Sequence, residues 1–288
     1  MRVLVLGGGG QVASAVVTSA PAEHQVVSRT RAELDIGDEQ ALAGAIAEIR
    51  AEWVINAAAY TAVDLAEDQR AQAIAVNDTA VGGLVAATAK ARCRLLHLST
   101  DFVFDGKLNR AYSPTDATHP LSVYGASKLG GEHQVLYGAR SGIVLRTSWV
   151  YAATGRNFVL TMLRLMRERG QVSVVCDQIG TPTWATSLGT AIWGLIEVAA
   201  PGGIYHWTDL GVASWYDFAV AIQDEALARG LLSRAVSITP ISSAAFPTRA
   251  QRPAFSVLDT GATRALIKVP TRHWRHNLRT QLDELRIS

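Results

Sequence analysis

The chain begins with an apolar run that leads directly into four consecutive glycines, and this beginning constrains its fold more than any other feature. Residues 2–6 are typical of a buried strand, the glycines of a tight turn, and the residues after Gly10 of a helix. Gly7, Gly10 and Ala13 follow a Gly-x-x-Gly-x-x-Ala spacing, which lets backbone approach a pyrophosphate at the helix N-terminus. A glycine-rich loop without a ligand is the alternative, but the strand, turn and helix favour a dinucleotide site.

Short apolar runs alternate with helical patterns over the first half of the chain. Strands are expected at residues 25–28, 53–56, 95–98 and 142–146, with amphipathic or alanine-rich helices between them. The apolarity of these runs is continuous rather than alternating, which indicates strands covered on both faces of a parallel sheet with right-handed crossovers. We therefore predict an α/β fold with a Rossmann-like doubly wound parallel sheet.

Beyond about residue 150 the rhythm changes, which predicts a smaller C-terminal α/β substrate lobe. We expect helices at 158–168, 184–198 and 215–228, strands at 172–175 and 204–207, a proline-containing loop at 240–253 and a terminal helix. Residues 1–150 are predicted to form the dinucleotide-binding domain, which also receives later C-terminal segments, and residues 151–288 mainly the substrate-binding lobe. With 288 residues the chain can bury a substantial core.

Composition argues against several classes of function. The net charge of +2 gives no reason to expect a nucleic-acid surface. Cys93 and Cys176 are isolated and no secretion signal is present, so we expect a reducing compartment, the cytoplasm. The apolar stretch at 190–200 contains Glu197 and is too short to span a bilayer. The seven histidines form no recognisable ligand motif, so no metal site is predicted.

Tyr124 and Lys128 are four residues apart in a segment that can be helical, which places a phenol and an ammonium on one face. A lysine charge near a phenol favours the phenolate, so we expect a lowered pKa for Tyr124 and proton exchange with a carbonyl near neutral pH. Such a pair is common in helices by chance. Its weight here comes from the dinucleotide site predicted in the same chain.

Ligands of open α/β sheets bind outside the carboxyl ends of the strands, so the residues that follow each strand are candidates for a site. After the second strand come Ser28, Arg29 and Arg31, and an arginine here can pair with a ribose 2′-phosphate, favouring NADP over NAD. A solvated basic turn is the alternative. Asp35 and Ile36 are candidates for contact with adenine, although Asp35 can equally cap the helix that begins near residue 38.

The next two strand ends offer small side chains and a hydroxyl. Ala57, Ala58 and Ala59, followed by Tyr60, would let a cofactor lie against the backbone after the third strand. After the fourth strand, the Thr100 hydroxyl can hydrogen-bond a substrate carbonyl, and a helix-capping hydroxyl is the alternative.

Several motifs are spread almost from end to end of the chain. They are Gly-Gln-Val at 10–12, Asn-Ala-Ala-Ala-Tyr-Thr-Ala-Val-Asp at 56–64, Leu-Ser-Thr-Asp-Phe-Val-Phe-Asp-Gly at 98–106, the run 124–132, Arg-Thr-Ser-Trp-Val-Tyr at 146–151, Asp-Gln-Ile-Gly-Thr-Pro-Thr at 177–183 and Arg-Pro at 252–253. Together they are highly specific. The chain resembles the extended short-chain dehydrogenases/reductases, and within them the dTDP-4-dehydrorhamnose reductase family.

The resemblance implies NADPH, or NADH, as the cofactor and a nucleotide-linked 4-keto-6-deoxy sugar as the substrate, with dTDP-4-dehydro-L-rhamnose reduced to dTDP-L-rhamnose. Tyr124 would protonate the C4 oxygen, Thr100 would polarise it, and Lys128 would bind the nicotinamide ribose and keep the pKa of Tyr124 low. The cofactor-binding residues implied are Gly7, Gly10, Gln11, Val12, Ser28, Arg29, Asp35, Ile36, Ala57, Ala58, Ala59, Tyr60, Tyr124 and Lys128.

The same resemblance implies a substrate site beside these residues. Val63 and Trp149 would flank the sugar ring, with Asp101, Phe102 and Asn157 nearby, besides Thr100 and Tyr124. A tryptophan suits this place because its flat apolar face covers the C–H side of a sugar. Core packing is the alternative for both flanking residues.

Departures and alternatives refine this interpretation. Related sugar-nucleotide dehydratases have the sequence Thr-Asp-Glu at the place of residues 100–102 and use the extra carboxylate to drive elimination. This chain has Phe102 instead of the glutamate, which disfavours elimination. A reductase of another nucleotide-activated keto sugar, or a nonenzymatic relative resembling the regulatory beta subunit of methionine adenosyltransferase, remain as alternatives. Ala15 and Thr186 stand where family members with magnesium-linked dimers carry glutamates, so we predict a monomer or a metal-independent dimer.

Overall fold

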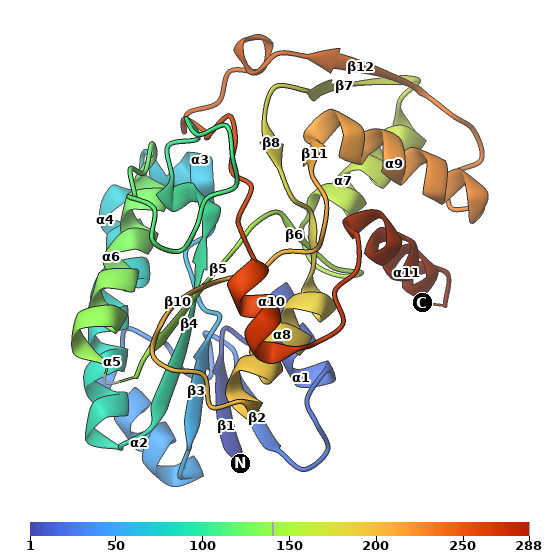
Figure 1. Ribbon diagram of the computed structural model, residues 1–288. Helices are drawn as coiled ribbons and strands as arrows, with labels where there is room; N and C mark the ends of the chain where they lie inside the picture. The colour runs from blue at the N-terminus through green and yellow to red at the C-terminus, as the bar shows by residue number, and fades with distance from the viewer. Residues whose placement is uncertain (140, 288) are drawn as a thin grey trace.

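A six-stranded sheet forms the centre of the protein, whose computed structural model describes residues 1–139 and 141–287 (Figure 1). Its strand order is β10-β5-β4-β3-β1-β2, and every neighbouring pair is parallel. The predicted α/β fold with a parallel sheet is confirmed. The strands are β1 (Arg2–Leu6), β2 (Gln25–Arg29), β3 (Trp53–Asn56), β4 (Arg94–Thr100), β5 (Ile143–Thr147) and β10 (Gly203–His206).

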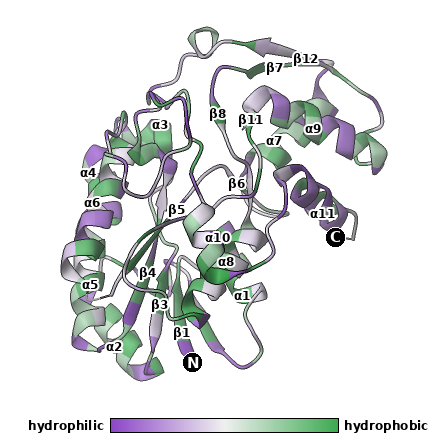
Figure 2. Cartoon of the chain, in the orientation of Figure 1, coloured by the Kyte–Doolittle hydropathy of each residue, from purple (hydrophilic) through white to green (hydrophobic). Residues whose placement is uncertain are grey.

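Helices cover both faces of this sheet, as the continuous apolarity of the strands predicts. Val3 and Val5 belong to the core beneath α1 (Gln11–Thr18) and α8 (Ala185–Glu197). Leu4 and Leu6 point to the opposite core, beneath α2 (Glu39–Ile49), α5 (Ala80–Lys90) and α6 (Val123–Gly138). Figure 2 shows the hydrophobic colouring of α8, in contrast to the hydrophilic α11 (Trp274–Ile287).

The sheet changes its winding direction at β1, because β2 pairs with one edge of β1 and β3 with the other. The carboxyl ends of β1 and β3 therefore lie side by side, and Ala57 N donates to Leu6 O over 3.1 Å. Gly7 has φ +86°, and a Cβ on it would lie 2.6 Å from Ala58 N. Only glycine fits there, at the kind of switch point where doubly wound sheets bind ligands.

The segment between β3 and β4 begins with two short helices, α3 (Val63–Ala66) and α4 (Arg70–Ile74), which continue through the π-helical turn η1 (Ala75–Thr79) into α5. The 3-10 turn η2 (Asp101–Val103) follows β4 directly. These short elements border the carboxyl ends of the central strands and surround the start of α6.

A second core forms the smaller lobe. Phe218 and Ile222 of α9 (Trp215–Ala228) pack with Leu278 and Leu282 of α11 and with residues of α7 (Phe158–Glu168). The lobe also contains three two-stranded pairings, formed by β6 (Val150–Tyr151) with β9 (Thr183–Trp184), β8 (Ile179–Gly180) with β11 (Ala213–Ser214), and β7 (Gln171–Val175) with β12 (Ser237–Ile241). The turn η3 (Ser243–Ala245) follows β12.

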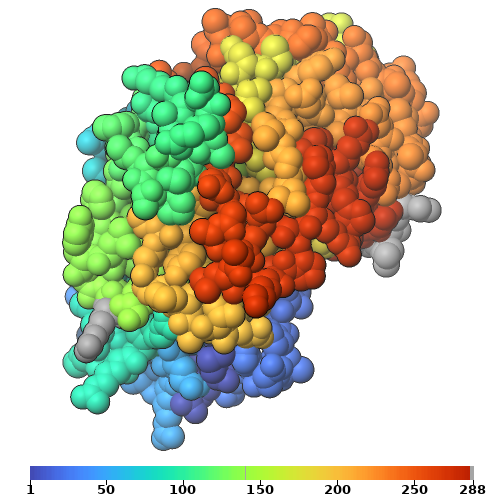
Figure 3. All heavy atoms as spheres, viewed as in Figure 1, coloured from blue at the N-terminus to red at the C-terminus, as the bar shows by residue number. Residues whose placement is uncertain are grey.

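Two elements beyond residue 150 belong to the layers of the central sheet. The strand expected at 204–207 is β10, which pairs with β5, and α8 packs against α1. Helix α10 (Gly261–Ile267) packs in turn on α8 and β10, and Figure 3 shows this red surface between the two parts of the protein. Both 184–198 and 204–207 are predicted as parts of the smaller lobe, because an isolated apolar run does not reveal which sheet it joins.

Pro240 is a further difference, since it lies within β12 rather than in the predicted loop, paired in register with Val174. A two-stranded pairing has only edge strands, which tolerate a proline.

In the described part of the chain, no helix combines the length and the apolar character needed to cross a membrane.

Candidate active site

Thr100 and Tyr124 come together at the carboxyl end of β4. Thr100 is the last residue of the strand and is 7% exposed. Ser122 caps α6 by accepting a hydrogen bond from Gly125 N over 3.1 Å, so Tyr124 lies in the first turn of the helix. There the Thr100 hydroxyl lies close enough to the phenol to lower its pKa. The ring of Tyr124 also meets the edge of Phe102, with centroids 5.6 Å apart and planes at 75°.

Gly125 permits this approach of α6 to the end of β4. A Cβ at this position would overlap the carbonyl oxygen of Phe102, and it would also lie 3.0 Å from Pro120 Cβ. The Tyr-Gly sequence therefore has a steric cause. The glycine lets the helix lie against the turn after β4, and this contact sets where the tyrosine ring stands.

The predicted effect of Lys128 on Tyr124 is wrong for this arrangement. Burial raises the pKa of Tyr124 to about 12, the Thr100 hydrogen bond opposes this rise, and the charge of Asp101 adds to it. Lys128 Nζ instead donates to Leu98 O over 2.7 Å. The phenol consequently stays protonated at neutral pH, which is the state required of a proton donor.

Lys128 is almost completely enclosed, with 3% of its surface exposed. Its Nζ lies 3.2 Å from His97 Nε2 besides its bond to Leu98 O. Burial lowers the pKa of Lys128 to about 8, and the nearby charge of Glu132 acts in the opposite direction. Lys128 therefore titrates much closer to neutral pH than an ordinary lysine.

Asp101 is the second titratable group beside Tyr124. Its Oδ1 accepts a hydrogen bond from Thr100 Oγ1 over 3.1 Å, while Thr100 Oγ1 accepts one from Phe102 N over 3.2 Å. Thr100 thus caps the η2 turn, as the capping alternative states, and its hydrogen bond to a substrate carbonyl stays a prediction. Burial raises the pKa of Asp101 to about 6, against hydrogen bonds from Ser256 and Thr100.

The residues predicted to bind a cofactor gather around the switch point at β1. Helix α1 begins after Gly10 without any side-chain cap, which leaves its first N–H groups directed at a ligand position. Gln11 and Val12 form the start of this helix. At the end of β2, Arg29 O accepts a hydrogen bond from Gly8 N over 2.7 Å. Ser28 precedes Arg29, and the segment Ala57–Ala58–Ala59–Tyr60 follows β3 on the other side.

Asp35 and Ile36 do not join this group through their side chains. Ile36 is 5% exposed and packs in the core beneath α2 and α5. The carboxylate of Asp35 accepts from Gly37 N over 2.8 Å and pairs with Arg31 over 3.2 Å. Asp38 rather than Asp35 caps α2, by accepting from Ala41 N over 2.9 Å. The capping alternative for Asp35 is therefore wrong, and Ile36 serves the core.

Trp149 has an unusual backbone conformation for a bulky residue, with φ +46°. Its indole stacks on that of Trp215, with centroids 3.5 Å apart and planes 6° apart. One face of the predicted sugar-flanking ring is thus covered by a tryptophan of α9 that the sequence did not single out. Val63, the other predicted flanking residue, begins α3 and is half-buried.

Asn157 and Gln11, predicted to bind substrate and cofactor respectively, are hydrogen-bonded to each other. Asn157 Nδ2 donates to Gln11 Oε1 over 3.0 Å and to Ala152 O over 2.9 Å. Its Oδ1 caps α7 by accepting from Leu160 N over 3.0 Å. The two amides therefore join the smaller lobe to the start of α1.

Asn77 is a buried residue of this region that the sequence analysis missed. Its amide donates to Tyr60 O and to Ser127 Oγ, each over 3.0 Å, and its Oδ1 accepts from Tyr60 N over 2.8 Å. It thereby joins the segment after β3 to α6. Asn77 lies in the π-helical turn η1, within a run of small and apolar residues that carries no sequence signal for such a role.

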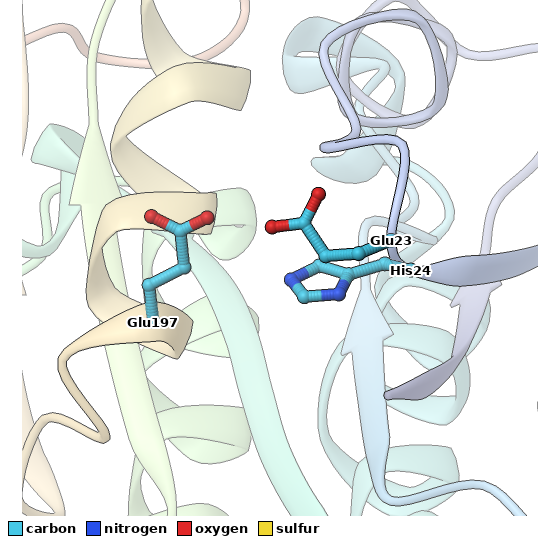
Figure 4. A group of neighbouring side chains, drawn as sticks. All are labelled: Glu23, His24 and Glu197. Carbon is cyan, nitrogen blue, oxygen red and sulfur yellow. The ribbon is translucent and has the colours of Figure 1, made fainter.

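One group of potential metal ligands lies elsewhere among the described residues. Ligand atoms of Glu23, His24 and Glu197 all lie within 4.8 Å of one another. Figure 4 shows the two carboxylates pointing toward each other, with the imidazole beside Glu23. His24 immediately precedes β2, so the group lies at the amino ends of the strands and forms no part of the candidate active site. The expectation of a metal-independent site stays a prediction.

Comparison with known proteins agrees with this arrangement. A family described as "RmlD substrate binding domain" matches residues 1–287. A dTDP-4-dehydrorhamnose reductase of Burkholderia thailandensis is 43% identical over 286 residues, covering 96% of each chain. A solved structure of a dTDP-4-dehydrorhamnose reductase from Clostridium acetobutylicum is similar with a TM-score of 0.93, at 33% identity, covering 99% of this chain and 100% of that one.

A second solved structure, the dTDP-4-dehydrorhamnose reductase of Bacillus anthracis in complex with NADP, has a TM-score of 0.92 at 32% identity. It covers 98% of this chain and 99% of its own. The resemblance predicted from the motifs is confirmed, and the chain belongs to the RmlD substrate binding domain family.

Proposed function

We propose that this protein is an NADPH-dependent oxidoreductase that reduces the C4 keto group of a nucleotide-linked 4-keto-6-deoxy sugar, namely dTDP-4-dehydro-L-rhamnose to dTDP-L-rhamnose. The observation that carries the proposal is the placement of Thr100, at the carboxyl end of β4, beside a protonated Tyr124 in the first turn of α6. The name of the relative at 43% identity supplies the substrate class.

The glycine turn fits a dinucleotide. A Cβ on Gly7 or Gly8 would meet backbone at 2.6 to 2.8 Å, so only glycines leave this backbone in its place, and the uncapped start of α1 offers N–H groups to a pyrophosphate. Arg29 and Ser28 at the end of β2 suit the ribose 2′-phosphate of NADPH, with NADH as a possible substitute. The relative solved with NADP supports this choice. When bound, NADPH supplies the hydride for C4.

The chain's own residues supply the proton and hold the reacting oxygen. Thr100 hydrogen-bonds the C4 oxygen and Tyr124 gives its proton to it, since its raised pKa keeps the phenol protonated until the oxygen gains charge. Lys128 in its charged form binds the nicotinamide ribose. Trp149, which packs against the core of the smaller lobe, holds the sugar against this group together with residues of that lobe.

We propose that the two parts of the protein, each with its own hydrophobic core, bind different molecules. Residues 1–150, with α8 and β10, bind the dinucleotide, and the remaining C-terminal residues mainly bind the nucleotide sugar. We further propose a cytoplasmic protein that acts as a monomer or a metal-independent dimer, without a nucleic-acid partner. The free thiols of Cys93 and Cys176 support a reducing compartment.

The proposal is tested by following NADPH absorbance with a panel of nucleotide-linked 4-keto sugars that differ in base and sugar. Oxidation of NADPH with the dTDP-linked 4-keto-6-deoxy sugar, followed by identification of the product's C4 stereochemistry, is the expected result. Turnover with a different nucleotide sugar alone would assign another keto-sugar reductase. Binding without turnover of any of them would contradict an enzymatic role.

A further inference from the structure

A line of buried polar groups runs through the sheet behind the candidate active site, from β3 through β4 to α6. Asn56 and His97 have no exposed surface, and Lys128 has 3%. Asn56 Nδ2 lies 3.0 Å from His97 Nδ1, and His97 Nε2 lies 3.2 Å from Lys128 Nζ. Because these groups are buried, a donor without an acceptor within the line is costly.

The orientation of the Asn56 amide decides the protonation of the imidazole. Ala58 N donates to Asn56 Oδ1 over 3.1 Å, so the amide nitrogen is the group that faces His97. An amide nitrogen only donates, and His97 Nδ1 must therefore accept. A ring that accepts at Nδ1 is neutral and carries its proton on Nε2.

The Nε2–H of His97 then points at Lys128 Nζ. An uncharged amine has a lone pair that accepts this hydrogen bond while one of its own hydrogens goes to Leu98 O, 2.7 Å away. An ammonium has no lone pair, so its hydrogens would face the imidazole N–H as donor against donor. Proton gain at Lys128 therefore costs the hydrogen bond between Nε2 and Nζ, at a buried position.

We infer that Asn56 and His97 are positioning residues that control the proton of Lys128, because their fixed hydrogen-bond direction presents a donor to its Nζ and favours the uncharged amine. The catalytic meaning of this control rests on the proposed function, in which the charged form of Lys128 binds the nicotinamide ribose. The direction of the hydrogen bonds does not depend on that function.

The charges around Lys128 do not explain why its uncharged form is favoured. Glu132, one helical turn along α6, favours the ammonium, but it is itself held by Arg146 of β5 over 2.6 Å. On the side of η1, Asp78 accepts from Gln134 Nε2 over 2.9 Å. Burial lowers the pKa of His97 well below its usual value, with the charge of Lys128 adding to the effect, which agrees with a neutral ring.

His206, the other buried histidine of the sheet, has no donor facing another donor. Arg146 Nη1 lies 3.4 Å from His206 Nε2 and can only donate, which places the ring proton on Nδ1. His206 Nδ1 lies 3.0 Å from Tyr112 O, an acceptor. Every donor there has its acceptor, whereas the line to Lys128 is satisfied only by an uncharged amine.

The first test is nitrogen NMR of the whole protein labelled at histidine and lysine, which distinguishes protonated from bare ring nitrogens without reference to activity. We expect His97 to be bare at Nδ1 and protonated at Nε2 between pH 6 and 9, with Lys128 Nζ titrating in the same range. A ring proton on Nδ1, or an imidazolium, would overturn the inference, and this arm needs no variant.

The second test reverses the line with Asn56→Asp, whose carboxylate accepts where the amide donated. The ring proton of His97 should move to Nδ1, so that Nε2 accepts from the ammonium and the Lys128 Nζ titration shifts up by about one pH unit or more. Thr88→Val, a buried polar change on α5, is the matched control and should shift nothing. If the ring proton of His97 moves but the titration of Lys128 does not, the inferred influence of His97 on Lys128 is contradicted. Failure of NADPH turnover alone would count against the proposed function and leave both NMR results decisive.

Discussion

Arg146 and Glu132 form an ion pair inside the protein, with Arg146 Nη2 2.6 Å from Glu132 Oε2 and side chains only 2% and 1% exposed. Arg146 Nε donates to the other carboxylate oxygen over 2.8 Å, and the Ser99 hydroxyl donates to that same oxygen. The pair binds α6, which carries Tyr124 and Lys128, to strands β4 and β5. Its geometry therefore helps to hold the candidate catalytic residues against the sheet.

Removing one partner of this pair should destabilise the protein strongly. Glu132→Gln leaves the Arg146 charge buried without its partner, and we expect the free energy of unfolding to fall by about 3–5 kcal/mol. Denaturant unfolding measures this loss. Glu168→Gln is the matched control, because its pair with Arg164 is 52% to 61% exposed and should change stability by less than about 0.5 kcal/mol. Equal small losses in both variants would contradict a structural role for the buried pair.

The pH dependence of reduction should follow Lys128 rather than Tyr124. The pKa of Lys128 is about 8, so its charge is present below that pH and is lost above it, and kcat/KM should fall as the pH rises through 8. Tyr124, with a pKa of about 12, stays protonated over this range and adds no change. Rate measurements from pH 6 to 10 test this, with Lys128→Met as the comparison that should lack the fall near pH 8. A wild-type profile that stays flat to pH 10 would refute the assignment.

Adding a methyl group at Gly125 should damage the site without unfolding the protein. Gly125→Ala forces α6 away from the Phe102 carbonyl and moves Tyr124, and a displacement of about 1 Å can cost about 10²-fold in rate. Gly44→Ala on α2 is the matched control, because a Cβ there meets nothing within 4 Å and should leave the rate unchanged. Steady-state kinetics on folded samples compare the two, and wild-type turnover in Gly125→Ala would show that this close approach is dispensable.

Assembly should not depend on a divalent metal at the position used by magnesium-linked relatives. Ala15 is 6% exposed beneath α8 and offers no oxygen ligand, and neither does Thr186 offer a carboxylate. Gel filtration with and without a chelator should therefore give one elution volume. A dimer that dissociates when the chelator is added would disprove this prediction.

Local patterns predicted the central fold because β1, β3, β4 and β5 are continuous apolar runs buried on both faces. The glycine turn was predictable for a related reason, since backbone close approach at Gly7 leaves a direct mark in the sequence. The pairing of strands that are far apart in the sequence leaves no such signal in either segment. The place of β10 beside β5 depends on packing that no single segment encodes.

The same distinction separates the predicted from the missed parts of the site. Thr100 and Tyr124 were predicted because they end a strand and begin a helix, and both lie at the carboxyl end of β4. The environment of Lys128 was missed, because helical spacing says which face it occupies but not that His97 and Leu98 O take up its hydrogen bonds. A histidine inside the apolar run 95–98 was the available signal.

The central claim is that Tyr124 donates the proton in a carbonyl reduction, and Tyr124→Phe tests it most directly. NADPH oxidation with the dTDP-linked 4-keto sugar is measured beside NADPH binding, with Tyr137→Phe as the matched control because that side chain is 87% exposed. We expect a loss of turnover of at least ~10²-fold in Tyr124→Phe, nearly unchanged NADPH binding, and normal turnover in the control. Wild-type turnover in Tyr124→Phe would contradict the central claim.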